Sequence, residues 1–141
     1  MARILAIDYG LKRTGLAVTD PDQIIATPLE VIQTSSLITF IKTYLKGNDV
    51  EAFVIGYPTR LDNSDTDVTG KVRGLATQLK NKFRGIEVHL HDERFTSSMA
   101  LDSMITGGTR KKDRRNKMII DKISATIILQ SYLEQRSMGH R

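Results

Sequence analysis

The sequence contains no cysteine among its 141 residues. This absence excludes disulfides and thiolate metal ligands, and it suits a reducing compartment. Long hydrophobic runs are absent too. The apolar run near the N-terminus, residues 3–8, ends at an acid and is shorter than a signal peptide or a membrane span requires. We therefore expect a cytoplasmic protein with no membrane partner.

The sequence also lacks internal repeats, low-complexity tracts and linkers rich in proline and serine. Its length suffices for one domain with one core and is too short for two ordinary domains. The hydrophobic share of 40% and the charged share of 26% are typical of a globular chain. We expect a single domain over residues 1–141, present as a monomer or a weak homodimer.

Positive charge is in excess, with 21 Lys and Arg against 16 Asp and Glu and a formal net charge of +5. A basic surface attracts polyanions, because Lys and Arg neutralise phosphates and release their counterions. The charge alone is equally compatible with a cationic surface that binds no nucleic acid. The motifs must therefore decide between these two interpretations.

Hydrophobic periodicity and turn residues predict an α/β protein. Three strands come first, and Pro28 favours an edge position for the third. Helices and strands then alternate, which predicts a mixed sheet with helices on both faces. The predicted strands are residues 3–8, 13–19, 24–31, 52–55 and 86–90, and the predicted helices begin at Ser35 or Ser36 (to 46), at 68 (to 83), at Thr96 or Ser97 (to 105) and at 115 (to 134).

Three acidic residues stand at notable places in this pattern. Asp8 ends the first strand, Glu93 follows the fifth strand, and Asp121 borders the apolar stripe of the last helix. Each has an ordinary alternative role. Asp8 could cap the following turn, Glu93 could pair with Arg94 or support the next helix N-terminus, and Asp121 could be a solvated surface residue.

A shared role explains the positions of the three acids better than three separate roles do. If the last helix crosses the sheet, the carboxylates of Asp8, Glu93 and Asp121 converge and repel one another unless cations neutralise them. Oxygen ligands in a chain without cysteine favour Mg²⁺ or Mn²⁺ over zinc. Two such ions, about 3.5–4 Å apart, can bind the attacking and leaving oxygens of a phosphodiester. We therefore predict that these acids are both the metal ligands and the catalytic residues.

Cations lie close to these acids in the sequence. Six of the eight residues 110–117 are Lys or Arg, and this basic segment directly precedes the helix that bears Asp121. A solvated charge run is the usual explanation, but the neighbouring acid favours a clamp on the nucleic-acid backbone. The predicted nucleic-acid-binding residues are Lys12, Arg13, Arg94, Arg110, Lys111, Lys112, Arg114, Arg115 and Lys117.

His89 and His91 alternate with apolar residues, so both should point to one face of the fifth strand. His-x-His can bind zinc, but a third nitrogen or sulfur ligand is not evident nearby. We favour a polar sheet face for the pair. His91 is a weak candidate for the acidic site because it is close to Glu93.

Four sequence blocks resemble the YqgF family of the ribonuclease H-like superfamily. They are residues 8–17 (DYGLKRTGLA), 56–58 (GYP), 92–97 (DERFTS) and 121–133, which opens with DKISA and ends with ILQSYL. The blocks occur in the family's order and spacing and span nearly the whole chain. Tyr57 and residues 62–64 (DNS) depart from the family pattern, and we expect these changes to adjust a loop on the substrate side.

The resemblance implies a ribonuclease H-like fold with a five-stranded mixed sheet, in which three antiparallel strands are followed by two parallel ones. It implies Asp8, Glu93 and Asp121 as the acidic triad. In many ribonuclease H-like enzymes the second acid lies on the fourth strand, so here Glu93 must reach inward. The implied function is a metal-dependent endonuclease that processes the 5′ end of the small-subunit ribosomal RNA precursor. The family is also described as Holliday-junction resolvases, which makes branched DNA the second substrate.

Two functions of other classes remain open. A non-catalytic RNA-binding factor for ribosome assembly would use the basic segment 110–117 equally well. An ATP-using protein is the other, because Asp-x-Gly at a first strand also opens actin-like folds. Such folds need a second domain to close over the nucleotide, and 141 residues leave no room for it.

Overall fold

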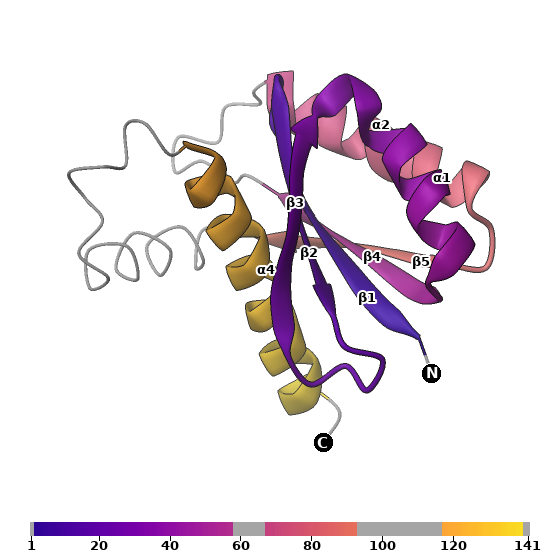
Figure 1. Ribbon diagram of the computed structural model, residues 1–141, viewed down its shortest axis with the longest axis vertical. Coiled ribbons are helices and arrows are strands. Elements are labelled where there is room, and N and C mark those ends of the chain that lie inside the picture. Colours follow the sequence, from indigo (N-terminus) through magenta and orange to yellow (C-terminus); the bar gives the residue numbers. More distant parts are fainter. Residues whose placement is uncertain (1, 58–66, 93–116, 140–141) are drawn as a thin grey trace.

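A five-stranded sheet forms the centre of the computed structural model, which describes residues 2–57, 67–92 and 117–139 (Figure 1). The sheet order is β3-β2-β1-β4-β5, with β1, β2 and β3 antiparallel and with β4 and β5 parallel to β1. This confirms the predicted three antiparallel and two parallel strands. The strands are β1 (Arg3–Asp8), β2 (Arg13–Thr19), β3 (Ala26–Gln33), β4 (Val50–Tyr57) and β5 (Glu87–Asp92).

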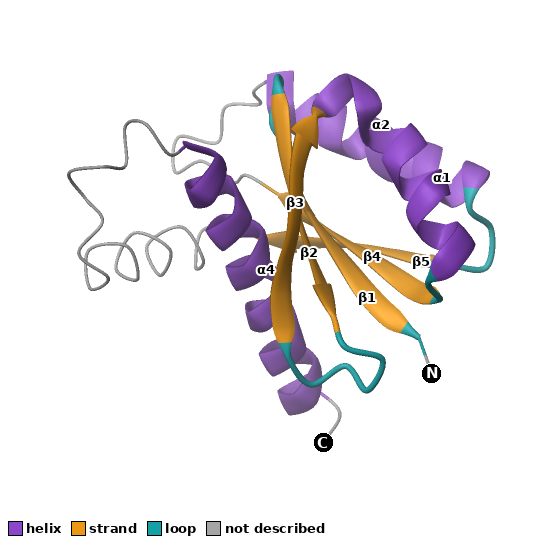
Figure 2. Cartoon of the chain, viewed as in Figure 1, coloured by secondary structure: helices purple, strands orange, loops and turns teal. Residues whose placement is uncertain are grey.

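Helices cover both faces of the sheet, as predicted (Figure 2). One face carries α1 (Leu37–Gly47), which follows a 3₁₀ turn, η1 (Thr34–Ser36), and α2 (Asp67–Lys82). The other face carries α4 (Lys117–Gly139). The helix predicted up to residue 105 lies outside the described residues. Within the described part of the chain, no helix is long and apolar enough to cross a membrane.

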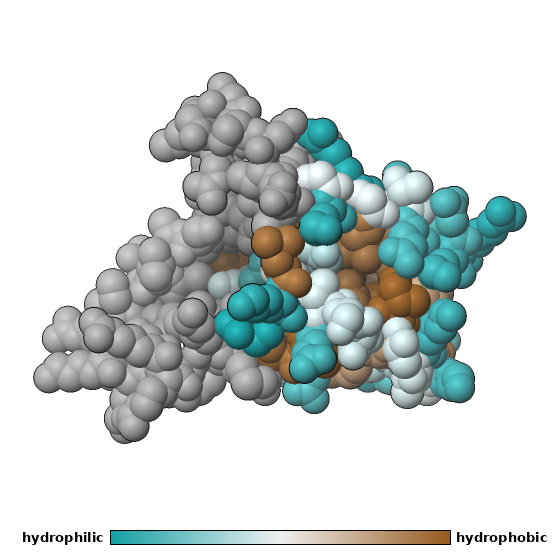
Figure 3. Space-filling view, turned by 90° about the horizontal axis from the view of Figure 1, so that it is seen from above, coloured by the Kyte–Doolittle hydropathy of each residue, from teal (hydrophilic) through white to brown (hydrophobic). Residues whose placement is uncertain are grey.

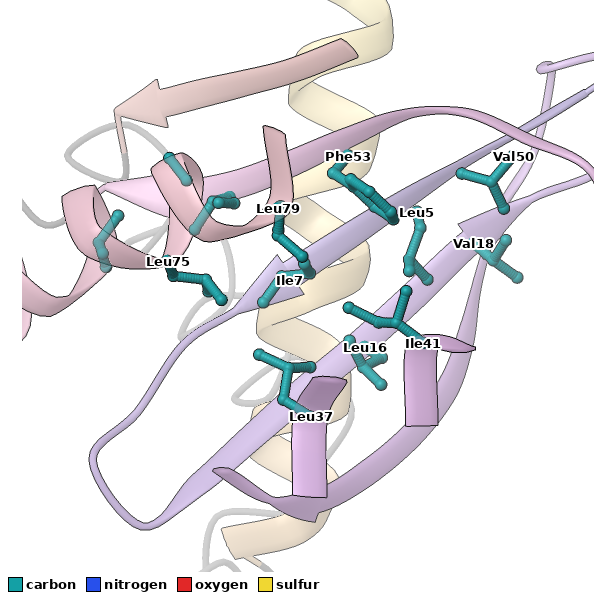
Figure 4. Close-up of a cluster of buried hydrophobic side chains, with 13 residues drawn as sticks. Leu5, Ile7, Leu16, Val18, Leu37, Ile41, Val50, Phe53, Leu75 and Leu79 are labelled. Atoms are coloured by element: carbon teal, nitrogen blue, oxygen red, sulfur yellow. The ribbon is translucent and has the colours of Figure 1, made fainter. Parts of the chain in front are cut away.

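Strand alternation divides the core into two clusters. On β1, Leu5 and Ile7 face α1 and α2, whereas Ile4 and Ala6 face α4. Figure 4 shows the first cluster, in which Leu37 of α1 and the α2 leucines lie on the same side of the sheet as Ile7. Each face is closed by apolar burial against its own helices, which is the main stabilising contribution of this architecture.

The cluster under α4 is made largely of small side chains. Alanine is the buried residue at one position on each of β1, β2, β4 and α4, so the helix can lie close to the sheet. Larger apolar residues from α4 fill the space between these contacts. The cluster consists of Ile4, Ala6, Ala17, Ala52, Val54, Ala125, Ile128, Leu129 and Leu133.

The third strand begins and ends two residues later than predicted. Ile24 and Ile25 are exposed in the β2–β3 turn, because their N–H groups both donate to Asp20 Oδ1 at 2.8 Å. The strand then continues to Gln33 through pairing with β2. Its edge position is confirmed, and the register shifts next to Pro28, where a missing N–H is tolerated.

Several other predicted boundaries were wrong: β4 begins at Val50, β5 runs from Glu87 to Asp92, and α4 continues to Gly139. The fourth strand was expected to stop at Gly56, but its pairing with β5 extends through Tyr57 to Asp92. Ser36 occupies the N-cap position of α1, as predicted, but its side chain makes no capping hydrogen bond, and a 3₁₀ turn leads into the helix. The predicted end of that helix is confirmed, and Asn48 Nδ2 donates to the Tyr44 carbonyl at 3.2 Å.

The packing of α4 predicts a large stability loss for Ile128→Ala. The Ile128 side chain is 1% exposed, so its truncation should lower the free energy of unfolding by about 2–5 kcal/mol. Gln130→Ala on the exposed side of the same helix should change it by less than about 0.5 kcal/mol. Urea denaturation measures both variants. Equal losses for the two would contradict the described orientation of α4.

Candidate active site

Asp8 is the last residue of the central strand β1 and is half-buried. Alternation places it on the same face as Ala6, which is the face that α4 covers. Its partner across β2 is Gly15, and in the parallel register with β4 the residue at this level is Gly56. Glycines therefore flank Asp8 on both sides, and neither neighbour places a side chain beside the carboxylate.

The position of Asp121 follows from the direction of α4. Asp121 is the fifth residue of the helix and lies one turn before Ala125, which is buried against the sheet. Figure 1 shows the C-terminal end of α4 near the β2–β3 turn. That turn lies at the start of β1, where Ile4 N–H donates to Thr19 Oγ1 at 2.9 Å. The N-terminal part of α4 therefore lies toward the Asp8 end of the sheet.

The parallel strand β5 brings the chain to the same edge. Its last residue, Asp92, pairs with Tyr57 at the end of β4. Glu93 follows directly but lies outside the described residues, and the side chain of Asp121 is likewise not described. Across the described ranges, no group of three or more His, Asp or Glu residues is placed to hold a metal. The metal triad of Asp8, Glu93 and Asp121 thus stays a prediction.

The loop after Asp8 is fixed by a threonine far away in the sequence. The Thr34 hydroxyl donates to the Gly10 carbonyl at 2.6 Å and lies 2.9 Å from the Thr14 hydroxyl. The Thr34 N–H donates to the Lys12 carbonyl at 3.0 Å. Gly10 is required in this loop because a Cβ atom there would overlap the carbonyl oxygen of Arg13. The role of Thr34 was not predicted, since nothing in its local pattern indicates these contacts.

A hollow of about 540 Å³ lies beside this loop. Lys12, Arg13, Gln33 and Ser35 supply its polar lining, together with apolar residues from the loop and β3. Arg13 and Gln33 pair across β2 and β3 on the Asp8 face. Cationic and neutral donors in one hollow can bind a phosphate group.

Of the predicted nucleic-acid-binding residues, Lys12 and Arg13 line this hollow. The other predicted members fall where the structure gives no side-chain description. Lys117 begins α4, and its side chain is not described. Arg94, Arg110, Lys111, Lys112, Arg114 and Arg115 lie outside the described residues.

A buried polar contact joins the end of β5 to α4. His91 is 5% exposed, and its Nε2 atom lies 2.9 Å from Ser131 Oγ. The Tyr132 ring contacts both histidine rings of β5, with centroids 5.5 Å from His89 and 6.4 Å from His91. Burial raises the pKa of Tyr132, while nearby Arg136 acts in the opposite direction. The phenol therefore stays protonated at neutral pH.

The two histidines lie on one face of β5, as alternation predicted, and this is the face that α4 covers. His89 Nε2 lies 2.8 Å from Glu87 Oε1 on the same strand, and His91 bonds to α4. They form the polar sheet face that we favoured over a zinc site. Because His91 is two residues before Glu93, its bond to Ser131 positions the strand that leads to this acid.

The contacts of Thr34 predict that Thr34→Val loosens the loop after Asp8. Removal of the hydroxyl breaks its bond to Gly10 and its contact with the fully buried Thr14. We therefore expect the free energy of unfolding to decrease by about 1–3 kcal/mol. Hydrogen exchange at residues 10–13 should become faster. Thr34→Ser keeps the hydroxyl and serves as the control. Slow exchange in the valine variant would contradict this role.

Ser131→Ala tests the contact between β5 and α4. Loss of the bond to buried His91 should lower the free energy of unfolding by about 1–3 kcal/mol in urea denaturation. The NMR resonances of the His91 ring should shift as well. Gln130→Ala, one residue earlier and exposed, provides the reference. Unchanged stability and unchanged His91 resonances would show that the contact does not hold the strand.

Comparisons with known proteins match these observations. A relative from Amoebophilus asiaticus, named "Putative pre-16S rRNA nuclease", is 51% identical over 133 residues, which are 94% of either chain. A relative of the same name from Phocaeicola vulgatus is 48% identical over 136 residues, 96% of this chain and 98% of its own. Among solved structures, Thermus thermophilus RuvC in complex with a Holliday junction substrate has a TM-score of 0.57. The two sequences are 14% identical, and the match covers 99% of this chain and 97% of the RuvC chain. This similarity is one of fold.

The family model described as "RuvX: Holliday junction resolvase" matches residues 2–135. This match and the relatives confirm the resemblance to the YqgF family and the ribonuclease H-like fold. The relatives named as nucleases are similar to this chain over nearly its whole length. The chain therefore belongs to the RuvX family.

Proposed function

We propose that this protein is a metal-dependent endonuclease that cleaves phosphodiester bonds and processes the 5′ end of the small-subunit ribosomal RNA precursor. Asp8, Glu93 and Asp121 act as the metal-binding and catalytic acids. The observation that carries the proposal is the position of Asp8. It ends the central strand between two glycines, on the face that α4 covers.

The chemistry of these residues fits Mg²⁺ or Mn²⁺. Carboxylate oxygens are hard ligands of the kind that both ions prefer, and the glycines beside Asp8 place no side chain in the way of an ion. A bound divalent ion would supply a hydroxide at neutral pH and stabilise the leaving oxygen. The protein's part is to hold the acids in place and to bind the phosphate through Lys12 and Arg13, which line the neighbouring hollow.

The names of the relatives support ribosomal RNA precursor as the substrate. The description of the family supports a second candidate, branched DNA. Phosphate contacts and metal ligands act on the sugar-phosphate backbone and serve both nucleic acids. The two candidates therefore share one site, and only a comparison of substrates separates them.

Asp8→Asn should remove the nuclease activity and leave the fold intact. Loss of a charged ligand should cost at least as much as loss of a supporting residue, so we expect a decrease on the order of a hundredfold or more. The assay follows cleavage of precursor RNA and of a four-way DNA junction with Mg²⁺ or Mn²⁺. Asp22→Asn, the same change in the exposed β2–β3 turn, should cleave like the wild type.

The outcomes separate the hypotheses. Equal activity of Asp8→Asn and the wild type would contradict the catalytic assignment. Cleavage of the DNA junction but not of the RNA would favour the resolvase. If the wild type binds RNA without metal and cleaves neither substrate, the protein is the non-catalytic assembly factor instead.

A further inference from the structure

Tyr9 follows Asp8 directly and lies on the other face of the sheet. It is half-buried and packs against the cluster that α1 and α2 cover, whereas Asp8 belongs to the α4 face. Neighbouring Cα atoms in a trans chain are about 3.8 Å apart. The end of β1 therefore places an acid of the proposed active site and an aromatic ring within one residue of each other, on opposite sides of the sheet.

A pocket of about 390 Å³ opens beside Tyr9, between the start of α1 and the middle of α2. Leu37, Ile38 and Leu75 supply an apolar wall next to the tyrosine. Figure 4 shows that Leu37 and Leu75 come from the two helices on this side of the sheet. In the view of Figure 3, the described surface also exposes hydrophobic residues among hydrophilic ones.

The polar lining of the pocket is cationic and amide-bearing. Lys71 and Gln78 of α2 are both exposed at its rim, and the described residues that line it include no acid. An apolar wall with an aromatic ring suits the face of a nucleobase, and a carboxamide can bond to the edge of the base. A lysine ammonium can bind the phosphate of the same nucleotide.

We propose that this pocket holds an unpaired nucleotide of the nucleic-acid substrate, next to the phosphodiester bond that is cleaved at Asp8. The proposal rests on the proposed nuclease function for the identity of the substrate. A strand that meets Asp8 on one face and passes the end of β1 reaches Tyr9 on the other face. An unpaired base exposes both its face and its edge, so the pocket should favour substrates with an unpaired base near the cleavage site.

Gly74→Met is the sharpest test, because it fills the pocket without harming the fold. Gly74 lines the pocket from α2, and a Cβ atom there meets nothing within 4 Å. Replacement of an exposed helical glycine also favours the helix. Gly70→Met is the matched control: it lies one turn earlier on α2, its Cβ also meets nothing within 4 Å, and it does not line the pocket.

The first measurement is the binding of a short single-stranded RNA in metal-free buffer, followed by fluorescence anisotropy. Gly74→Met should weaken binding about tenfold, which is the effect expected when one stacked base loses its place. Gly70→Met should bind like the wild type. Lys71→Gln should weaken binding less and reduce its dependence on salt. Equal affinities for Gly74→Met and Gly70→Met would overturn the proposal.

Competition identifies the group that the pocket recognises. A nucleoside monophosphate should displace the RNA from the wild type at concentrations where inorganic phosphate does not, and the difference should vanish in Gly74→Met. Equal displacement by inorganic phosphate would overturn the nucleotide assignment, because it would show a site for phosphate alone.

Cleavage distinguishes the failure of this inference from the failure of the proposed function. With Mn²⁺, Gly74→Met should lose activity on RNA that carries an unpaired nucleotide and keep its activity on a perfect duplex. If the wild type cleaves and Gly74→Met cleaves each substrate as fast as the wild type does, only the pocket is wrong. If the wild type cleaves neither substrate but Gly74→Met still binds RNA more weakly than Gly70→Met, the nucleotide pocket is supported and the nuclease function is contradicted.

Discussion

The close contact between α4 and the sheet is the constraint on which the candidate site depends. Ala6, Ala17 and Ala52 of the sheet share one buried cluster with Ala125 of the helix. The distance between packed elements depends on the side chains between them, so larger residues here would hold α4 farther away. Asp121 is one turn from Ala125, and its distance from the end of β1 would grow by the same amount. Small residues in the core therefore determine whether the acids can share a ligand.

The alternation of β1 is a second constraint, because it assigns each side chain to one face. Asp8 lies on the α4 face and Tyr9 packs on the opposite one. A slip of one residue would exchange these faces and bury the acid against α1 and α2. The register is held by antiparallel pairing with β2 and by the bond from Ile4 to Thr19. The end of one short strand thus supplies both the proposed catalytic acid, Asp8, and the ring of the proposed nucleotide pocket, Tyr9.

Local patterns predicted the first two strands to the residue and missed the ends of the other three. The limits of β1 and β2 coincide with an acid and with turn residues, which act locally. Gln33 and Tyr57 belong to strands only because Arg13 and Asp92 lie opposite them. Such pairing depends on distant segments, so hydrophobic periodicity near these residues carries no sign of it.

The same difference applies to the site. Asp8, Glu93 and Asp121 were predicted from their places at element ends and from the family motifs, and the structure describes the side chain of the first alone. Thr34 lies 24 residues from the carbonyl that it binds, and His91 lies 40 residues from Ser131. These contacts hold the loop after Asp8 and the strand before Glu93. The geometry of the acids therefore depends on residues whose own sequence surroundings do not reveal that role.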